Sequence, residues 1–483
     1  MTSDNQQISS FFDAASAASQ AILEAIKSGV TIYLYSHLDA DGIAAAGVIG
    51  KALYRLNARF RIRITQWVDE KLISEIFEEK PQMVIFIDLG TEFASLLKQK
   101  VSDSNLLVLD HHQIIEVLPE GFLCVNPHLF GIDGSKSISS SGVAYFVAKA
   151  LDPSNVDLAP IAVVGALGDL QDKYEQRMLG GLNQKIVEDA QREGLLTVEK
   201  DLLFFGRETR PIHKALASTT SPFIPEISGA EDKSLDFLMK LGIQLKHDDR
   251  WRALRDLSED EKRKLCSALA DYLLSRGMRY EVSNLIGYVY TLTREKPWTP
   301  TRDGREFAFL LNATGRMDKS GLGVAICMGD KGSALEEANR VLEDYRRNIN
   351  RYLKWIMEKP ERLREMENIY VVYGEDFVED KMIGAVSSIL SASLLNTEKP
   401  LIAYTKASEG RLMKVSARTT DMMVSKGVNL GRIMQIAAEK CLGKGGGHDI
   451  AAGAQIPIEN IDLFIRLVNE LVGKSLAGGD IGS

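Results

Sequence analysis

The chain has 483 residues, of which 45% are hydrophobic and 26% are charged, with a formal net charge of -8 at pH 7. This balance is typical of a globular protein, and the length suits roughly three domains of about 150 residues each. The net negative charge argues against a protein that coats nucleic acid by bulk charge, but it does not exclude a nuclease with a locally positive groove.

The cysteines and the apolar runs indicate the cellular compartment of the protein. Cys124, Cys266, Cys327 and Cys441 are widely spaced and form no CxxC pair. This usage is typical of a reduced, cytoplasmic protein and argues against a zinc site built on thiolates. No stretch approaches the ~18 consecutive apolar residues of a bilayer-spanning helix, so we expect no membrane segment.

Residues 1–200 alternate short apolar runs with helical patterns. The segments TIYLYSH, RFRIRIT, MVIFIDL and LLVLDHH are rich in β-branched and aromatic residues, and helical stretches such as IAAAGVIGKALYRL separate them. Strands that alternate with helices predict a parallel sheet covered by helices on both faces. The nearly continuous apolar character of the strands agrees with burial on both sides.

The pattern changes after this α/β domain. DKSLDFLMKLGI and SEDEKRKLCSALADYLLSRG have apolar residues at helical spacing, and Ser258 with Glu261 forms a plausible capping box, so we expect a mostly helical insertion over 201–285. Residues 286–345 form a connecting segment in which LLNATGRMDKSGLGVAICMGD is expected to be a turn or loop leading to a strand. A second, smaller α/β domain is expected over 346–483.

Acidic and histidine side chains end four apolar segments of the first domain. They are His37, Asp39 and Asp41 in YLYSHLDADG, Asp88 in MVIFID, Asp110, His111 and His112 in LLVLDHH, and Asp169 in IAVVGALGD. A single aspartate after a strand is usually a helix cap or a turn residue. In an open α/β sheet, however, ligands gather at the carboxyl ends of the strands, so we expect all four segments to end at one edge.

Such a cluster of carboxylates indicates a metal site. Buried together without a cation, the aspartates would repel one another and would be costly to desolvate. Carboxylate and imidazole ligands without thiolate suit Mn²⁺ or Mg²⁺ better than structural zinc. The set is too large for one ion and suits two ions about 3.5–4 Å apart that share a bridging carboxylate. The chemistry indicated is hydrolysis of a phosphoester or phosphoanhydride.

These motifs also carry a family resemblance. SHLDADG, FID, LDHH and GALGD, in that order and spacing, resemble the four motifs of the DHH phosphoesterase superfamily, and GKGGGHDIAAGA resembles the signature of its C-terminal DHHA1 domain. The resemblance implies a parallel-sheet DHH domain, a smaller α/β DHHA1 domain across a cleft, and an insertion between them. GRETRPIHKAL and FLMKLGI are similar to segments of archaeal RecJ-like exonucleases, which include the GINS-associated nuclease branch.

The resemblance also implies roles for the clustered residues. The metal ligands that it implies are His37 and Asp39 for one ion, Asp41, His111 and Asp169 for the other, and Asp88 as the bridge. His112 would face the substrate phosphate and stabilise charge in the transition state. Asp110 would orient a histidine, as carboxylates around metal sites do.

A second group of residues is expected to hold the substrate. The N–H groups of Gly445, Gly446 and Gly447 could form an anion-binding nest, and His448 and Arg418 could add donors to the same phosphate. A glycine run alone is usually a turn, but the resemblance to DHHA1 favours substrate binding.

The polar segment SKSISSSG belongs to the same hypothesis. Its Ser141 is a candidate phosphate contact within a flexible loop, although a plain surface loop is an equally good reading of this segment taken by itself.

The sequence therefore favours an exonuclease specific for single strands, preferring Mn²⁺ with Mg²⁺ possible, acting 5′-to-3′ on DNA in replication or repair. One alternative is a small-molecule phosphodiesterase acting on short oligonucleotides, cyclic dinucleotides or polyphosphate. Another is a replication scaffold whose insertion binds GINS or another replisome component. The polarity, the choice between DNA and RNA, and the oligomeric state stay open at this point.

Overall fold

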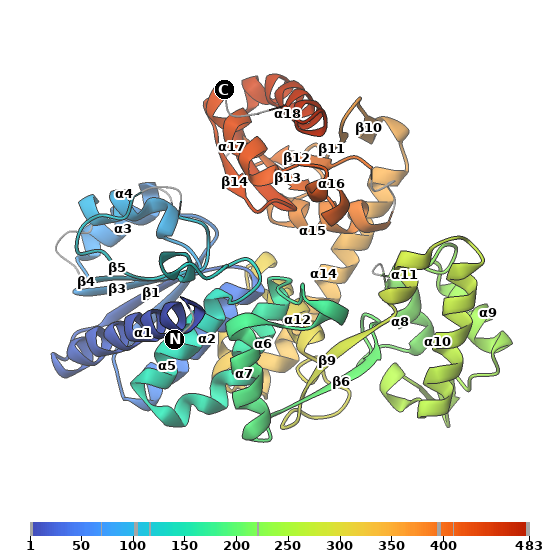
Figure 1. Ribbon diagram of the computed structural model, residues 1–483, viewed down its shortest axis with the longest axis horizontal. Coiled ribbons are helices and arrows are strands. Elements are labelled where there is room, and N and C mark those ends of the chain that lie inside the picture. The colour runs from blue at the N-terminus through green and yellow to red at the C-terminus, as the bar shows by residue number, and fades with distance from the viewer. Residues whose placement is uncertain are drawn as a thin grey trace. The chain divides into compact units, whose positions relative to one another are not determined.

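The computed structural model describes residues 3–68, 70–100, 105–114, 117–219, 222–393, 398–408 and 410–479. The chain folds into two units, Met1–Leu342 (unit 1) and Glu343–Ser483 (unit 2), whose elements are labelled in Figure 1. In the described part of the chain, none of the helices combines the length and the hydropathy needed to span a bilayer.

Unit 1 is built on a parallel sheet. Within the described residues it has five strands in the order β2-β1-β3-β4-β5. The strands are β1 (Ile32–His37), β2 (Phe60–Thr65), β3 (Met83–Ile87), β4 (Asn105–Leu109) and β5 (Leu123–Val125). Every residue of the central strand β3 is buried, as expected for a parallel strand covered on both faces. The predicted parallel sheet is confirmed.

Helices cover both faces of this sheet, as Figure 1 shows for α3 and α4 on one side and α1 and α2 on the other. The helices of this part are α1 (Ser3–Lys27), α2 (Ala40–Arg55), α3 (Glu70–Glu79), α4 (Ala94–Lys100), α5 (Ser140–Leu151), α6 (Ala159–Gly168) and α7 (Gly181–Arg192). On the α3/α4 face, Leu72 and Leu97 share a core with Phe86 and Val108 of the sheet.

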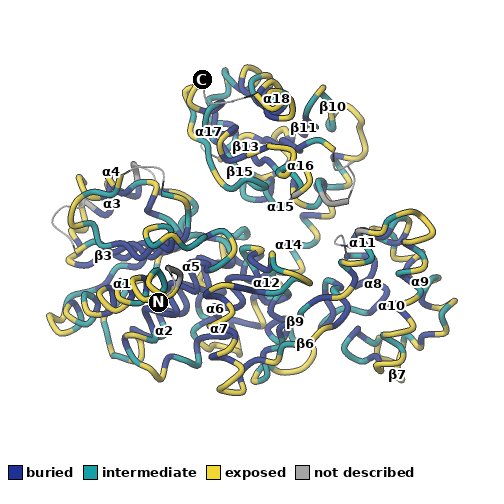
Figure 2. Tube along the Cα trace, in the orientation of Figure 1, coloured by how far each residue is buried: buried dark blue, intermediate teal, exposed yellow. Residues whose placement is uncertain are grey.

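Helix α6 explains one misleading pattern in the sequence. Its segment APIAVVGALG reads as an apolar strand, yet it is a helix that packs against α2, α5, α7 and α12 (Gly304–Arg316). Figure 2 shows α6 buried along its length. A helix enclosed on all sides loses its polar stripe, so hydrophobic periodicity cannot distinguish it from a buried strand.

The predicted helical insertion is confirmed, and a pair of antiparallel strands joins it to the rest of unit 1. These are β6 (Leu196–Leu202) and β9 (Ile286–Leu292), which pair with Leu202 opposite Ile286. Between them lie α8 (Ile212–Ser218), α9 (Glu231–Lys240), β7 (Lys246–His247), β8 (Arg250–Trp251), α10 (Glu259–Leu274) and α11 (Arg279–Ser283). The insertion has a hydrophobic core of its own, which includes Leu238, Leu254 and Leu269.

The segment after the insertion differs from the prediction. LLNATGRMDKSGLGVAICMGD forms the end of α12 and α13 (Ser320–Met328), with α14 (Ser333–Met357) following, so the expected loop and strand were wrong. The apolar run is a helix buried against α2, where a Cβ at Gly47 would overlap Cys327. Such close helix contact depends on small residues from both partners, which a single segment does not reveal.

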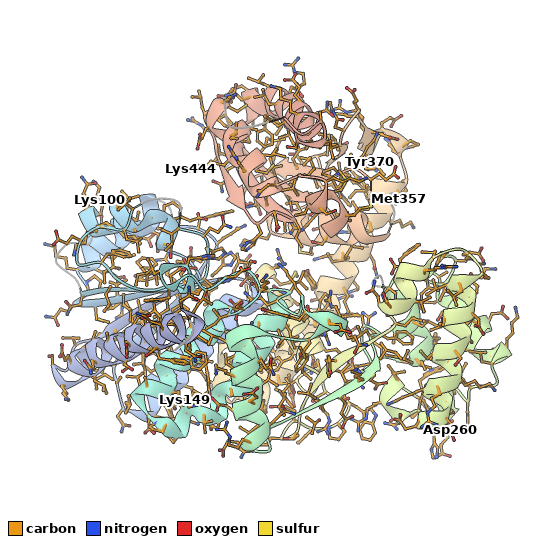
Figure 3. The ribbon with its side chains drawn as sticks, in the orientation of Figure 1. Lys100, Lys149, Asp260, Met357, Tyr370 and Lys444 are labelled. Carbon is orange, nitrogen blue, oxygen red and sulfur yellow. The ribbon has the colours of Figure 1, made fainter. Side chains whose placement is uncertain are left out.

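Unit 2 confirms the smaller second α/β part. In the described residues its mixed sheet has the order β10-β11-β12-β13-β15-β14, and Lys444 at the start of β14 is labelled in Figure 3. The strands are β10 (Leu363–Glu365), β11 (Tyr370–Tyr373), β12 (Leu401–Lys406), β13 (Leu412–Arg418), β14 (Lys444–Gly447) and β15 (Ala451–Pro457). The helices that accompany them are α15 (Asp380–Ser393), α16 (Asp421–Ser425), α17 (Leu430–Lys440) and α18 (Ile461–Leu476).

Candidate metal centre

Asp88 lies at the middle of the cluster, directly after β3. Its Oδ2 is 3.5 Å from Nδ1 of His37, and its Oδ1 is 3.5 Å from Nε2 of His111. The side chain is buried, yet neither oxygen accepts a hydrogen bond from a described residue. Its backbone has a positive φ of 61°, a conformation that costs a non-glycine residue about 1 kcal/mol. A buried carboxylate with no donor and strained backbone is the kind of group that a cation compensates.

One group of ligand atoms lies where β1 turns into α2. His37 ends β1, and Asp39 is the N-cap of α2, where its Oδ1 accepts a hydrogen bond from the Gly42 N–H at 3.0 Å. Nδ1 of His37 lies 3.0 Å from Oδ2 of Asp39. The ligand atoms of His37, Asp39 and Asp88 all lie within 4.8 Å of one another. Glycine is needed at position 42 because a Cβ there would overlap the His37 carbonyl.

A second group joins three elements. Asp41 in the first turn of α2, His111 after β4 and Asp169 after α6 bring ligand atoms within 4.8 Å of one another. The Asp41 carboxylate accepts hydrogen bonds from the N–H groups of Ser140, at 2.7 Å, and Ser141, at 3.1 Å, where α5 begins.

The tautomer of His111 follows from its surroundings. Nδ1 of His111 donates to the Gly134 carbonyl oxygen at 2.7 Å, because that oxygen can only accept. The other ring nitrogen, Nε2, faces Asp88 and Asp169 at 3.5 and 3.7 Å, and its lone pair becomes available when the ring is neutral. A neutral imidazole in this tautomer is suited to bind a metal through Nε2.

Asp110 holds the two neighbouring histidines. Its Oδ1 accepts hydrogen bonds from the His111 N–H at 2.8 Å, the His112 N–H at 3.2 Å and the His112 ring Nδ1–H at 2.8 Å. Its Oδ2 accepts from the Thr91 N–H at 3.2 Å. Ligand atoms of Asp88, His111 and His112 form a third group within 4.8 Å. Asp110 is thus saturated with donors, whereas Asp88 accepts from none of the residues that the structure describes.

The pKa values of the cluster reflect its concentration of buried carboxylates. Burial would lower the pKa of His37, but the carboxylates of Asp39 and Asp88 raise it to about 10. Burial would also lower the pKa of His112, and Asp110 raises it to about 9. Burial, with the nearby charge of Asp88, raises the pKa of Asp41 to about 7. All three shifts arise from buried carboxylates whose negative charge a cation would compensate, and so the residues fit a metal centre.

The structure thus brings together every residue that the sequence placed in the cluster. Some of these residues lie on other elements than the expected strand ends. Asp39 and Asp41 lie at the N-terminus of α2, because the chain leaves the extended conformation after His37. Asp169 caps the C-terminal end of helix α6. The prediction that these three aspartates end strands was therefore wrong.

Ser141 has a different position from the one predicted. It is fully buried in the first turn of α5, its hydroxyl donates to the Ala162 carbonyl at 2.9 Å, and its N–H binds Asp41. The prediction of a flexible loop that contacts phosphate was wrong for this residue, which supports a carboxylate of the cluster instead. Gly134 and Ser140 were missed because they act through the backbone, which leaves no side-chain signal in the sequence.

The glycine run of unit 2 does not form the predicted nest. Gly445, Gly446 and Gly447 lie in β14 and pair with β15 in an antiparallel ladder. Successive N–H groups of a strand point to opposite edges, so they cannot converge on one anion. The glycines instead permit close packing, since a Cβ at Gly445 would lie 2.6 Å from the Met434 carbonyl oxygen of α17.

Arg418 and His448 do lie at one end of the unit 2 sheet. Arg418 ends β13 opposite Ala451, and the His448 N–H donates to the Ala451 carbonyl oxygen at 2.9 Å. The Arg418 guanidinium donates from Nε to Ser388 Oγ at 2.8 Å and from one NH₂ group to the Ala417 carbonyl oxygen at 2.8 Å. These bonds fix the direction of the arginine side chain.

Three family models match successive parts of the chain. The model of the DHH family N-terminal domain matches residues 30–166, the DHH-CID domain matches 204–286, and the DHHA1 domain matches 367–474. The chain is 31% identical over 454 residues to an uncharacterized protein of Methanocaldococcus jannaschii, which covers 92% of this chain and 94% of that protein. It is also 27% identical over 192 residues to the single-stranded-DNA-specific exonuclease RecJ of Thermus thermophilus, across 38% of this chain and 27% of that protein.

Solved structures share the fold. RecJ of Thermus thermophilus in complex with Mn²⁺ has a TM-score of 0.56 at 17% identity, covering 95% of this chain and 55% of that one. This chain therefore spans about half the length of that RecJ. CDC45 from Entamoeba histolytica has a TM-score of 0.63 at 13% identity, covering 95% of this chain and 99% of that one.

Proposed function

Because the chain belongs to the DHH/DHHA1 family of RecJ-like proteins, we propose that this phosphoesterase is a metal-dependent exonuclease specific for single strands. We favour 5′-to-3′ action on DNA, in replication or repair. The observation that carries the proposal is Asp88, whose two oxygens lack donors among the described residues and face different ligand groups. A carboxylate placed in this way suits a bridge between two cations.

The residues divide into two cation sites. The proposed ligands are His37 and Asp39 on one side, Asp41, His111 and Asp169 on the other, and Asp88 between them. Oxygen and imidazole donors without thiolate suit Mn²⁺, which we favour, and Mg²⁺. When bound, the pair would lower the pKa of water and neutralise charge on the phosphate.

The chain itself would position the substrate phosphate. Asp110 accepts the Nδ1–H of His112 at 2.8 Å, so Nε2 is the ring nitrogen turned away from Asp110. We assign this nitrogen to a phosphate oxygen, where a donor stabilises the charge of the transition state. In unit 2, Arg418 and His448 are proposed to donate to phosphates of the bound strand.

End-labelled single-stranded DNA tests this function. With Mn²⁺, the wild-type chain should release mononucleotide at once from a 5′ label and only late from a 3′ label. Asp88→Asn, which keeps the shape but removes the charge, should lower the rate at least about 100-fold. The control is Asp260→Asn on α10, where the side chain is almost fully exposed and the rate should not change. Early release from the 3′ label would reverse the polarity.

Strand length distinguishes the small-molecule alternative. An exonuclease should cleave long single strands at least as fast as fragments of two to five nucleotides, because each cleavage leaves another substrate. Faster turnover of short fragments, cyclic dinucleotides or polyphosphate, again dependent on Asp88, would favour the small-molecule phosphodiesterase.

A second candidate function has its own support. The match to the DHH-CID domain and the fold shared with CDC45 favour a replication component whose insertion binds GINS or another replisome protein. The insertion has its own core, and its two ends meet in the β6–β9 strand pair, as expected of a docking module. Immobilised chain should retain purified GINS, and a chain without the insertion should not. Equal retention by both would exclude this docking role.

A further inference from the structure

Gln171 touches two parts of the candidate metal centre at once. It is fully buried, two residues after Asp169, and its Nε2 lies 2.9 Å from Oδ2 of Asp169 and 2.8 Å from the Gly134 carbonyl oxygen. The same carbonyl accepts the Nδ1–H of His111. We propose that Gln171 is a positioning residue that sets the geometry of the Asp41, His111 and Asp169 half of the centre. This inference rests on the proposed metal site.

The orientation of the amide is fixed by its neighbours. Nε2 of Gln171 also lies 3.2 Å from the Ile138 carbonyl oxygen. Carbonyl oxygens only accept, so the NH₂ end of the side chain must face Gly134 and Ile138. The opposite end, Oε1, accepts a hydrogen bond from Asn183 Nδ2 of α7 at 2.7 Å. Gln171 therefore presents donors, and no charge, to the carboxylate of Asp169.

A donor without charge has two effects here. It restrains the Asp169 carboxylate, which follows the last turn of α6, and it leaves the negative charge of that carboxylate available to a cation. Through Gly134 it also fixes the carbonyl that holds the His111 ring. Gly134 itself packs closely against His111, since a Cβ at this position would overlap the His111 carbonyl. Loss of a residue that supports metal ligands in this way typically lowers metal affinity or activity about 10–100-fold.

The other half of the centre has separate support. Asp39 is held by the Gly42 N–H at the start of α2, and His37 by its position at the end of β1. Neither of these two residues has a hydrogen bond with Gln171 among the contacts of the described residues. Loss of the Gln171 amide should therefore weaken one cation site and spare the other.

Titration with Mn²⁺ alone, in the absence of nucleic acid, tests this inference on the full chain. Gln171→Met keeps the length of the side chain but removes its donors, and calorimetry should show one site with the wild-type Kd and one weakened about 10–100-fold. Gln171→Glu should weaken the same site further, since a carboxylate would then face Asp169 and the Gly134 carbonyl. Gln171→Glu retains the shape of glutamine, so it tests the same inference if Gln171→Met does not fold.

A buried amide elsewhere in unit 1 provides the control. Asn155 is buried and donates to the Ala148 carbonyl at 2.8 Å, remote from the ligands. Asn155→Leu should lower the Tm while both Mn²⁺ sites keep their affinity. Two unchanged sites in Gln171→Met, or equal weakening of both, would overturn the positioning role. Wild-type chain that binds two Mn²⁺ ions but cleaves no phosphoester would overturn the proposed function and leave the Gln171 comparison intact.

Discussion

Two aspartates that follow neighbouring strands have opposite surroundings. Asp88 follows β3 and has no donor among the described residues, whereas Asp110 follows β4 and accepts four N–H groups, from Thr91, His111 and twice from His112. A carboxylate without donors suits direct binding of a cation, and one saturated with donors suits the orientation of others. The difference separates a proposed ligand from a proposed support without any knowledge of the reaction.

The substitution Asp110→Asn tests that separation. The amide has the same shape, but its NH₂ end must meet one of the N–H donors, so the ring of His112 loses its fixed orientation. We expect kcat on single-stranded DNA to fall about 10–100-fold, with Mn²⁺ stoichiometry unchanged. Steady-state kinetics and calorimetry measure the two quantities. Loss of a Mn²⁺ ion would instead make Asp110 a ligand.

At the scale of elements, α12 connects the insertion to the metal centre. Glu306 near its start accepts hydrogen bonds from the Glu208 N–H, at 2.6 Å, and from the Thr209 hydroxyl, both in the insertion. Near its end, Asn312 Oδ1 accepts from the Ala40 N–H at 3.1 Å, between the proposed ligands Asp39 and Asp41. One rigid helix therefore contacts both parts, and this contact positions the loop between β1 and α2.

The close contact at Gly315 gives a test of α12. A Cβ at Gly315 would overlap the Leu38 carbonyl oxygen in the loop that joins β1 to Asp39 and the start of α2. Gly315→Ala should therefore lower stability by about 1–3 kcal/mol and weaken Mn²⁺ binding, because helix or loop must shift. Gly321→Ala on α13 is the control, since nothing lies within 4 Å of the added methyl group. Unchanged Mn²⁺ binding in Gly315→Ala would show that the loop does not depend on this contact.

The cap of α10 predicts a dependence of stability on pH. Both oxygens of Glu261 accept from Arg252, at 2.8 and 2.7 Å, and one also accepts the Ser258 N–H. The bond from Arg252 lowers the pKa of Glu261 from 4.5 to about 2 in the folded chain. Since the folded pKa is the lower one, this stabilisation is present above pH 4.5 and is lost as the pH falls through about 2.

Urea unfolding of Glu261→Gln measures this contribution. At neutral pH we expect the variant to be less stable by about 1–2 kcal/mol, the usual range for a cap with a charged hydrogen bond. The difference in stability from wild type should shrink by about half or more near pH 3. At that pH the wild-type chain loses much of the stabilisation by the ionised Glu261, which the variant lacks at every pH. A difference that stays constant with pH would mean that the charge of Glu261 does not contribute.

At the scale of the whole molecule, local signals were predictable and distant partners were not. The capping box of α10 was predicted because Ser258 and Glu261 are three residues apart, and the parallel strands because each is a continuous apolar run. The clustering of acidic and histidine side chains was predicted from their position after apolar runs, although the run before Asp169 is the helix α6 and not a strand. The Asn312 contact with Ala40 could not be predicted, since these residues are 272 positions apart and only packing brings them together.

The insertion offers the last prediction, because it leaves and re-enters the fold at one point. Leu202 and Ile286 face each other in the β6–β9 ladder, so a two-residue Asn-Gly turn can replace residues 203–285. Glu306 then loses both of its donors in the insertion, and Glu306→Gln replaces the buried carboxyl group that would remain without them. The shortened chain should have a lower Tm but bind Mn²⁺ with the stoichiometry of Glu306→Gln in the full chain. If it lost Mn²⁺, the insertion would be part of the metal centre rather than a module attached to it.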